Sequence, residues 1–139
     1  MSQNPAPERM VLRSAVLPAP RFRYSPVVQV GSLVFVSGMV GLDADSGKLV
    51  DGGAFAQATQ VLRNLQALVD EMGWSMSQLV IARVFCAGAD AAPEVNRAWD
   101  AWFAELEPPA RTFMVVTALP LGAAVEIEFQ LLAGSRGLV

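Results

Sequence analysis

The chain has 139 residues, which is enough for one domain with one hydrophobic core. Charged residues make up 17% of it and hydrophobic residues 53%, whereas an ordinary soluble domain carries about 25% charged residues. This composition excludes disorder. It also predicts that a monomer exposes apolar surface, which we assign to a subunit interface.

Composition also excludes much familiar chemistry. The chain contains no histidine, so Ser/His/Asp and Cys/His triads, histidine bases and histidine-containing metal sites are ruled out. Its one cysteine, Cys86, lies in an apolar run and is expected to be an inert core thiol. A net charge of −3, with the cations scattered singly, argues against nucleic-acid binding. We expect no metal and no cofactor.

The amino-terminal residues are polar, contain prolines and lack the cationic start and apolar stretch of a secretory signal. We therefore predict a flexible tail over 1–10, a single domain over 11–139 and a cytoplasmic location. The longest apolar region, 27–42, is interrupted by polar residues and glycines and is too short to span a bilayer. No membrane association is expected.

The first third of the domain reads as strands and turns. A strand is predicted over Met10–Val16, followed by a proline-punctuated loop over Leu17–Pro26. The β-branched and aromatic runs Val27–Val30 and Leu33–Val36 are separated only by Gly31-Ser32, which predicts a hairpin.

The apolar period then changes to that of a helix. Over Ala54–Met72, apolar residues recur every three or four positions, and Gly73 stands where a helix C-terminal cap belongs. Leu79–Ala87 follows as a strand.

A second helix is predicted with Asp90 as its N-terminal cap, Pro93 in its first turn and Pro108-Pro109 as its end. Its inner stripe consists of Val95, Trp99, Trp102, Phe103 and Leu106. We assign this stripe to the core rather than to a cofactor site.

Two further strands are predicted over Ala110–Leu119 and Ala123–Ala133, joined at Pro120-Leu121-Gly122. Strands and helices alternate along the chain, and one sheet with both helices on one face is the simplest packing. Such a packing leaves the other sheet face bare, and a closed homo-oligomer would cover it.

The candidate chemistry lies on the last two strands. Strict alternation in 125–131 places Glu126 and Glu128 on one strand face, while Arg111 begins the preceding apolar strand. This arrangement favours a pair between Arg111 and a glutamate. Such a pair is either functional or a salt bridge at the sheet rim that contributes little.

Several segments together resemble the Rid family of imine deaminases, also called the YjgF family. The most specific are Pro109-Ala110-Arg111, Ala118-Leu119-Pro120 and Val125-Glu126-Ile127-Glu128. Earlier positions agree in order and spacing: Tyr24, Gly31, the run from Leu33 to Gly38, Gln57, Gln60, Leu62, Asn64, Leu65 and Val95-Asn96. The resemblance covers roughly 22–134.

The resemblance implies an α+β, chorismate-mutase-like fold: one mixed sheet of about six strands, with two helices on one face, assembled into a homotrimeric barrel with sites between subunits. It implies hydrolysis of 2-imino acids or their enamine tautomers to 2-oxo acids and ammonia without a cofactor. Arg111 matches the residue that binds the substrate carboxylate, and Glu126 the acid near the reacting carbon. The implied pocket residues are Tyr24, Ser37, Gly38 and Asn96.

The sequence also departs from the family pattern. Phe113 stands where many deaminating members carry cysteine, on the same strand face as Arg111. It is expected to make the substrate pocket smaller or more apolar. The segment before Tyr24 contains Arg23, which is either a second anion contact or a solvated charge. We interpret Glu128 as structural.

Three functions follow from these observations. The first is a general imine deaminase, and the second is a pathway-specific enamine deaminase of the aminomuconate or aminoacrylate type. The third is a non-catalytic regulatory trimer whose Arg111 binds a keto acid. Ribonuclease activity, attributed to some family members, ranks last because the chain is acidic and has no histidine.

Overall fold

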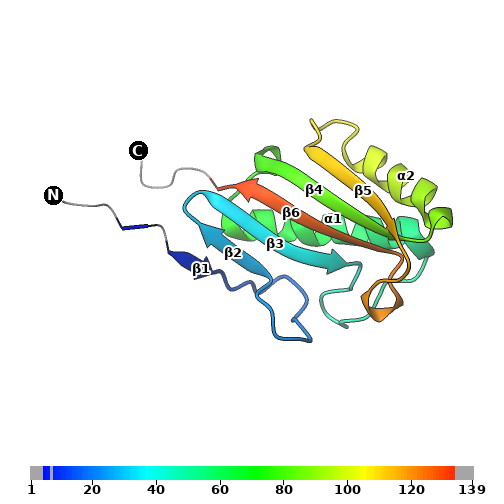
Figure 1. Ribbon diagram of the computed structural model, residues 1–139, viewed down its shortest axis with the longest axis horizontal. Coiled ribbons are helices and arrows are strands. Elements are labelled where there is room, and N and C mark those ends of the chain that lie inside the picture. The colour runs from blue at the N-terminus through cyan, green and yellow to red at the C-terminus, as the bar shows by residue number, and fades with distance from the viewer. Residues whose placement is uncertain (1–4, 7, 134–139) are drawn as a thin grey trace.

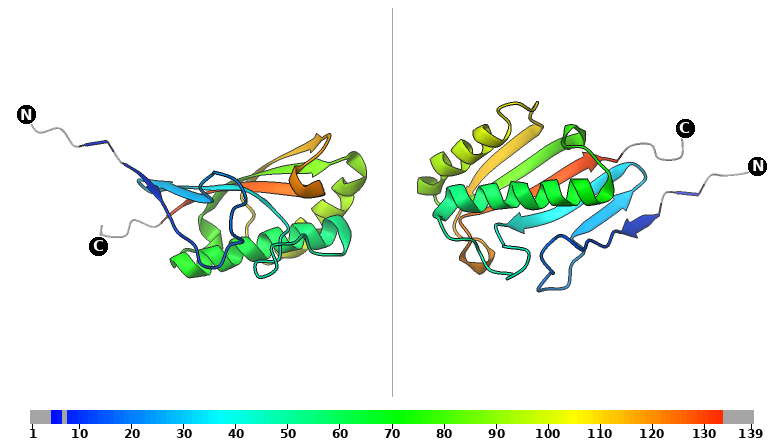
Figure 2. Two further views of the ribbon diagram at one scale, coloured as in Figure 1. Left: turned by 90° about the horizontal axis from the view of Figure 1, so that it is seen from below. Right: turned by 180° about the vertical axis from the view of Figure 1, so that it is seen from behind.

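The computed structural model describes residues 5–6 and 8–133, which form a six-stranded mixed sheet with two α-helices packed on one face (Figure 1 and Figure 2). The elements are β1 (Arg9–Val11), β2 (Val27–Val30), β3 (Leu33–Val40), α1 (Gly53–Met72), β4 (Leu79–Ala87), α2 (Ala92–Trp102), β5 (Ala110–Val116) and β6 (Val125–Leu132). The strand order is β1-β2-β3-β6-β4-β5, and only β4 and β5 are parallel. The predicted α+β class and helix placement are confirmed.

The core lies between this sheet and the two helices. Alternate residues of the central strand β6 point toward the helices and are almost completely buried, among them Ile127 and Phe129. Leu62 and Leu65 of α1 are fully buried opposite them, as the helical period predicts. Gly73 ends α1 in the left-handed conformation, as expected for its position. Cys86 is fully buried as well, and burial raises the pKa of its thiol.

No helix of the described residues covers the other sheet face (Figure 2). Four large apolar residues on its strands remain exposed: Leu33 (47%), Phe35 (37%), Met114 (43%) and Leu132 (45%). The low charge content of the sequence therefore corresponds to a definite surface of the isolated chain, one whose burial in an assembly would be favourable.

The start of the domain differs from the prediction. Strand β1 begins at Arg9, inside the segment assigned to the tail, and ends at Val11 instead of Val16. The chain turns because the Ser14 hydroxyl accepts the backbone N–H groups of Val16 and Leu17. Half of the predicted tail, 1–4 and residue 7, and the chain end, 134–139, lie outside the described residues.

The second helix was predicted too long at both ends. Asp90 does not cap it, because a 3-10 turn over Ala89–Ala91 comes first and the helix starts after Ala91. The helix ends at Trp102, since Phe103 already leaves the helical conformation, and Leu106 is exposed rather than part of the inner stripe.

The two C-terminal strands are shorter than predicted, and their connection, Pro120–Gly122, is a 3-10 turn. By contrast, the hairpin across Gly31 and Ser32 and the strand Leu79–Ala87 were predicted correctly. Strand β3 continues to Val40 because β6 pairs with it beyond Val36. Among the described residues, no helix is both long and apolar enough to cross a membrane.

Candidate functional site

The predicted site residues form two separate groups. The first, the arginine half-site, consists of Asn96 and Trp99 on α2 and Arg111 and Phe113 on β5. The Arg111 guanidinium donates a hydrogen bond from Nη1 to Oδ1 of Asn96 at 2.8 Å. Its central carbon lies 5.2 Å from the ring centre of Trp99 and 5.2 Å from that of Phe113. These two cation–π contacts hold the guanidinium in a defined orientation.

The arginine half-site is open to solvent. Arg111 is exposed and lies on the edge strand of the sheet. Within the described part of the chain, its only hydrogen bond is the one to Asn96, so most of its five N–H donors are available to a ligand. A planar, pre-oriented guanidinium of this kind suits bidentate binding of a carboxylate.

The second group, the carboxylate half-site, is built around Glu126 on β6. Strand β3 contains a bulge beside this residue and opposite Glu128, because Val36 pairs with Phe129 whereas Met39 pairs with Ile127 and Val40 with Glu126. Ser37 and Gly38 form the extra length, and such bulges redirect the strand locally. A Cβ on Gly38 would lie 2.6 Å from Oε1 of Glu126, so only a glycine lets the carboxyl group approach the backbone here.

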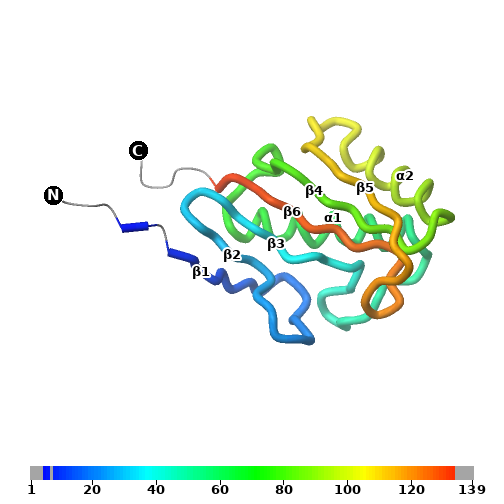
Figure 3. The backbone as a smooth tube through the Cα atoms, viewed as in Figure 1, coloured from blue at the N-terminus to red at the C-terminus, as the bar shows by residue number. Residues whose placement is uncertain are grey.

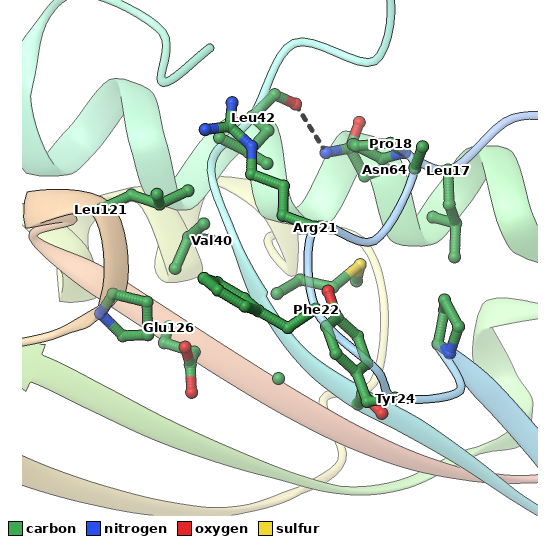
Figure 4. Close-up of a pocket in the computed structure, with 16 residues that line it drawn as sticks. Leu17, Pro18, Arg21, Phe22, Tyr24, Val40, Leu42, Asn64, Leu121 and Glu126 are labelled. Carbon is green, nitrogen blue, oxygen red and sulfur yellow. Dashed lines mark hydrogen bonds between the residues drawn. The ribbon is translucent and has the colours of Figure 1, made fainter. Parts of the chain in front are cut away.

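The chain before β2 covers this bulge. Strand β2 pairs with β3 only as far as Val36, and beyond it the Ser37 N–H and hydroxyl donate to the carbonyls of Pro26 and Ser25, at 2.9 and 2.7 Å. Figure 3 shows the segment between β1 and β2 looping out beside the sheet. Together these elements enclose a cavity of about 190 Å³ that includes Tyr24, Ser37, Gly38 and Glu126 in its lining (Figure 4).

Glu126 is electrostatically perturbed. Burial raises the pKa of its carboxyl group above the ordinary value, and the charge of Glu128 raises it further. Glu128 itself forms an ion pair with Arg83 across β4 and β6, with 3.4 Å between Nη1 and Oε1. The effect leaves Glu126 a stronger base than a free surface carboxylate.

The two half-sites do not meet within one chain. Strand β4 lies between β5 and β6, which rules out the predicted pairing of Arg111 with a glutamate of the neighbouring strand. Arg111 is in register with Ala82, which in turn pairs with Phe129 on the helix-covered face. Glu126 alternates to the opposite face. The pairing failed because the sequence does not reveal that β4 inserts between β5 and β6.

Sequence reasoning missed most of the cavity wall. Leu17, Pro18, Met39 and Leu121 all contribute, and no local pattern distinguishes them from ordinary loop or strand residues. Arg21, rather than Arg23, lines the cavity, and its guanidinium donates to the carbonyl of Gly47. Arg23 is exposed.

Comparison with known proteins agrees with this architecture. A family model described as Endoribonuclease L-PSP matches residues 14–132. The chain is 38% identical over 120 residues to a mouse protein named 2-iminobutanoate/2-iminopropanoate deaminase, covering 86% of this chain and 88% of that one. It is 31% identical to a RutC family protein of Aquifex aeolicus, covering 84% and 94%.

Two solved structures are also similar to this chain in sequence and in fold. RidA from an Antarctic Psychrobacter is 33% identical, with a TM-score of 0.80 over 88% of this chain and 98% of that one. A protein of the conserved Rid family from Yersinia pestis is 28% identical, with a TM-score of 0.84 over 91% and 100%. The fold thus places the chain in the class of small α+β proteins to which these relatives belong. The chain is a member of the Rid family.

Proposed function

We propose that the protein hydrolyses 2-imino acids, or the enamines in equilibrium with them, to 2-oxo acids and ammonia. The observation that carries this proposal is the arginine half-site, in which Asn96, Trp99 and Phe113 fix an exposed Arg111 guanidinium. A clamp for a carboxylate, combined with a partly buried glutamate base, is what hydrolysis of an already electrophilic imine carbon requires.

In this mechanism Arg111 binds the substrate carboxylate through two parallel hydrogen bonds and holds the C=N group in a fixed plane. Glu126 accepts a proton from a water molecule while the water oxygen bonds to the imine carbon, and it returns this proton to the nitrogen to give a neutral carbinolamine. Glu126 then takes the proton of the carbinolamine hydroxyl and passes it to the amine nitrogen. The C–N bond breaks as the C=O bond forms, which releases ammonia and leaves the 2-oxo acid.

The site is completed by a second subunit. Because Arg111 and Glu126 occupy opposite faces of the sheet in one chain, one subunit supplies the arginine half-site and its neighbour the carboxylate half-site. A homotrimer in which the helix-free sheet faces pack together would also cover the exposed Leu33, Phe35, Met114 and Leu132. A cytoplasmic location belongs to the same proposal.

Relatives named 2-iminobutanoate/2-iminopropanoate deaminase support this substrate class. The description Endoribonuclease L-PSP belongs to the family model, and two features argue against nuclease activity here: the chain has no histidine, and its net charge is −3.

Steady ammonia release from an imino acid would exclude the alternative of a non-catalytic regulatory trimer. A single enamine turned over far faster than simple imino acids would favour the pathway-specific one.

Subunit complementation tests the composite site. Arg111→Ala and Glu126→Gln are each expected to lower kcat/KM for an imino acid by about 10²–10⁴. When the two inactive variants are mixed under conditions of subunit exchange, about a quarter of the sites receive an intact arginine from one chain and an intact glutamate from another. Activity should recover to that level.

The matched control is the double variant mixed with an equal amount of wild type. About a quarter of the wild-type activity per site is expected if two chains share each site, and about half if one chain supplies both residues. Mixed single variants that assemble but stay inactive would refute the shared site. A wild-type protein that releases no ammonia from any imino acid would refute the deaminase.

A further inference from the structure

The cavity beside Glu126 has walls that are mostly apolar. Its lining is dominated by side chains such as Leu17, Phe22, Met39, Val40, Leu42 and Leu121 (Figure 4). Nothing in the hydrolysis of an imine requires such walls, because the reacting atoms are polar. They are suited to the substrate's side chain instead.

Three polar side chains of the wall, Ser37, Asn64 and Arg21, already make hydrogen bonds within the chain. Ser37 donates its hydroxyl hydrogen to the Ser25 carbonyl. Asn64 donates to the Leu42 carbonyl at 2.9 Å and accepts from Gln60 at 2.9 Å. The guanidinium of Arg21 is turned to the Gly47 carbonyl. Apart from the Tyr24 hydroxyl and the Glu126 carboxylate, a polar side chain entering the cavity would find few partners to replace its hydration.

The size of the cavity sets a lower limit on the preferred side chain. About 190 Å³ is more than the roughly 150 Å³ of an engineered apolar cavity that accepts benzene. A methyl group would leave most of this space as poorly hydrogen-bonded water. A branched aliphatic or aromatic group would fill it.

One wall residue is held there against its backbone preference. Leu121 has φ 61°, a left-handed conformation that disfavours every residue with a branched or bulky side chain. A glycine at this position would relieve the strain. The next residue in the turn, Gly122, is a glycine with φ 69°. The strain is retained where a leucine side chain closes the cavity.

We propose that the preferred substrates are 2-imino acids with large apolar side chains, from branched aliphatic to aromatic, seated in this cavity with the imine carbon toward Glu126. This inference rests on the proposed function. It deepens that function by naming which imino acids the site selects, since Arg111 recognises only the carboxylate that all of them share.

The test compares kcat/KM for imino acids generated in situ by an amino-acid oxidase from alanine, leucine, phenylalanine and glutamine. The leucine and phenylalanine imines are expected to exceed the alanine and glutamine imines by about tenfold or more. Equal values for all four would overturn the inference and leave the deaminase standing. No turnover of any of them would instead overturn the proposed function.

Two variants locate the preference in the cavity. Leu17→Trp adds bulk to the wall and should lower the leucine-to-alanine ratio at least about fivefold, whereas Arg63→Trp, on the exposed face of α1, should leave that ratio unchanged. Leu121→Gly relaxes the backbone while enlarging the cavity, so it should fold and shift preference from the leucine imine toward the phenylalanine imine. Ratios that stay at the wild-type value in both cavity variants would refute the assignment.

Discussion

The two half-sites are built by different means. The arginine half-site lies on regular secondary structure: Arg111 is the second residue of β5, and Asn96 and Trp99 are on α2. The carboxylate half-site depends on irregular backbone, because Glu126 faces the bulge at Ser37 and Gly38 and a loop that covers it. The first holds the common part of the substrate by charge and ring contacts. The second combines the base with an apolar cavity, where differences between substrates are recognised.

Among substitutions that distinguish the two half-sites, the largest effect on kcat is expected at Gly38. Gly38→Ala places a methyl group 2.6 Å from Oε1 and 2.9 Å from Cδ of Glu126, which forces the carboxyl group aside. Since a displacement of about 1 Å can cost roughly 10² in rate, kcat should fall by about that factor. The fold should survive, because the displaced atoms are the flexible end of a side chain. Steady-state kinetics and thermal melting measure both.

Gly41 supplies the matched control. A Cβ there would lie 2.6 Å from the backbone oxygen and 2.7 Å from the Cα of Gln57, so rigid α1 backbone would have to move. Gly41→Ala should therefore lower stability by about 1–3 kcal/mol while activity per folded molecule changes little. The contrast fails if Gly38→Ala keeps full activity or if Gly41→Ala is the more damaging of the two to kcat.

A smaller effect is expected at Asn96, which positions Arg111 without touching the reacting atoms. Asn96→Ala removes the 2.8 Å hydrogen bond but leaves both ring contacts of the guanidinium. KM for the imino acid should rise about tenfold, with kcat nearly unchanged, because loss of one charge-assisted hydrogen bond costs about 1.5–3 kcal/mol at most. A fall in kcat as large as that of Arg111→Ala would show instead that Asn96 acts on the chemistry itself.

The same contrast explains what the sequence could predict. Periodicity located α1, β4 and the hairpin, and the alternation of Glu126 with Val125 and Ile127 correctly placed them on opposite faces of β6. These signals are local. The insertion of β4 between β5 and β6 depends on contacts distant in sequence, so the interpretation of Arg111 and a glutamate as neighbours was wrong. The cavity wall escaped prediction for the same reason, since Leu17 and Leu121 come together only in the fold.

The smallest expected effect lies in the pH dependence and concerns the ion pair beside Glu126. The charge of Glu128 raises the pKa of Glu126, so Glu128→Gln should lower that pKa, and the released Arg83 should lower it further. Glu126 must be ionised to take a proton from water. The acidic limb of kcat/KM against pH should therefore move to lower pH in this variant, while the limiting rate at high pH changes little.

The opposite shift is expected for Arg83→Gln. Without its partner, the charge of Glu128 acts on Glu126 uncompensated and raises the pKa of Glu126 above its wild-type value, so the acidic limb should move to higher pH. Both variants remove the same ion pair, and the sign of the charge that remains beside Glu126 differs between them. Shifts in the same direction would mean that the acidic limb reports structural damage or titration of the substrate rather than the ionisation of Glu126.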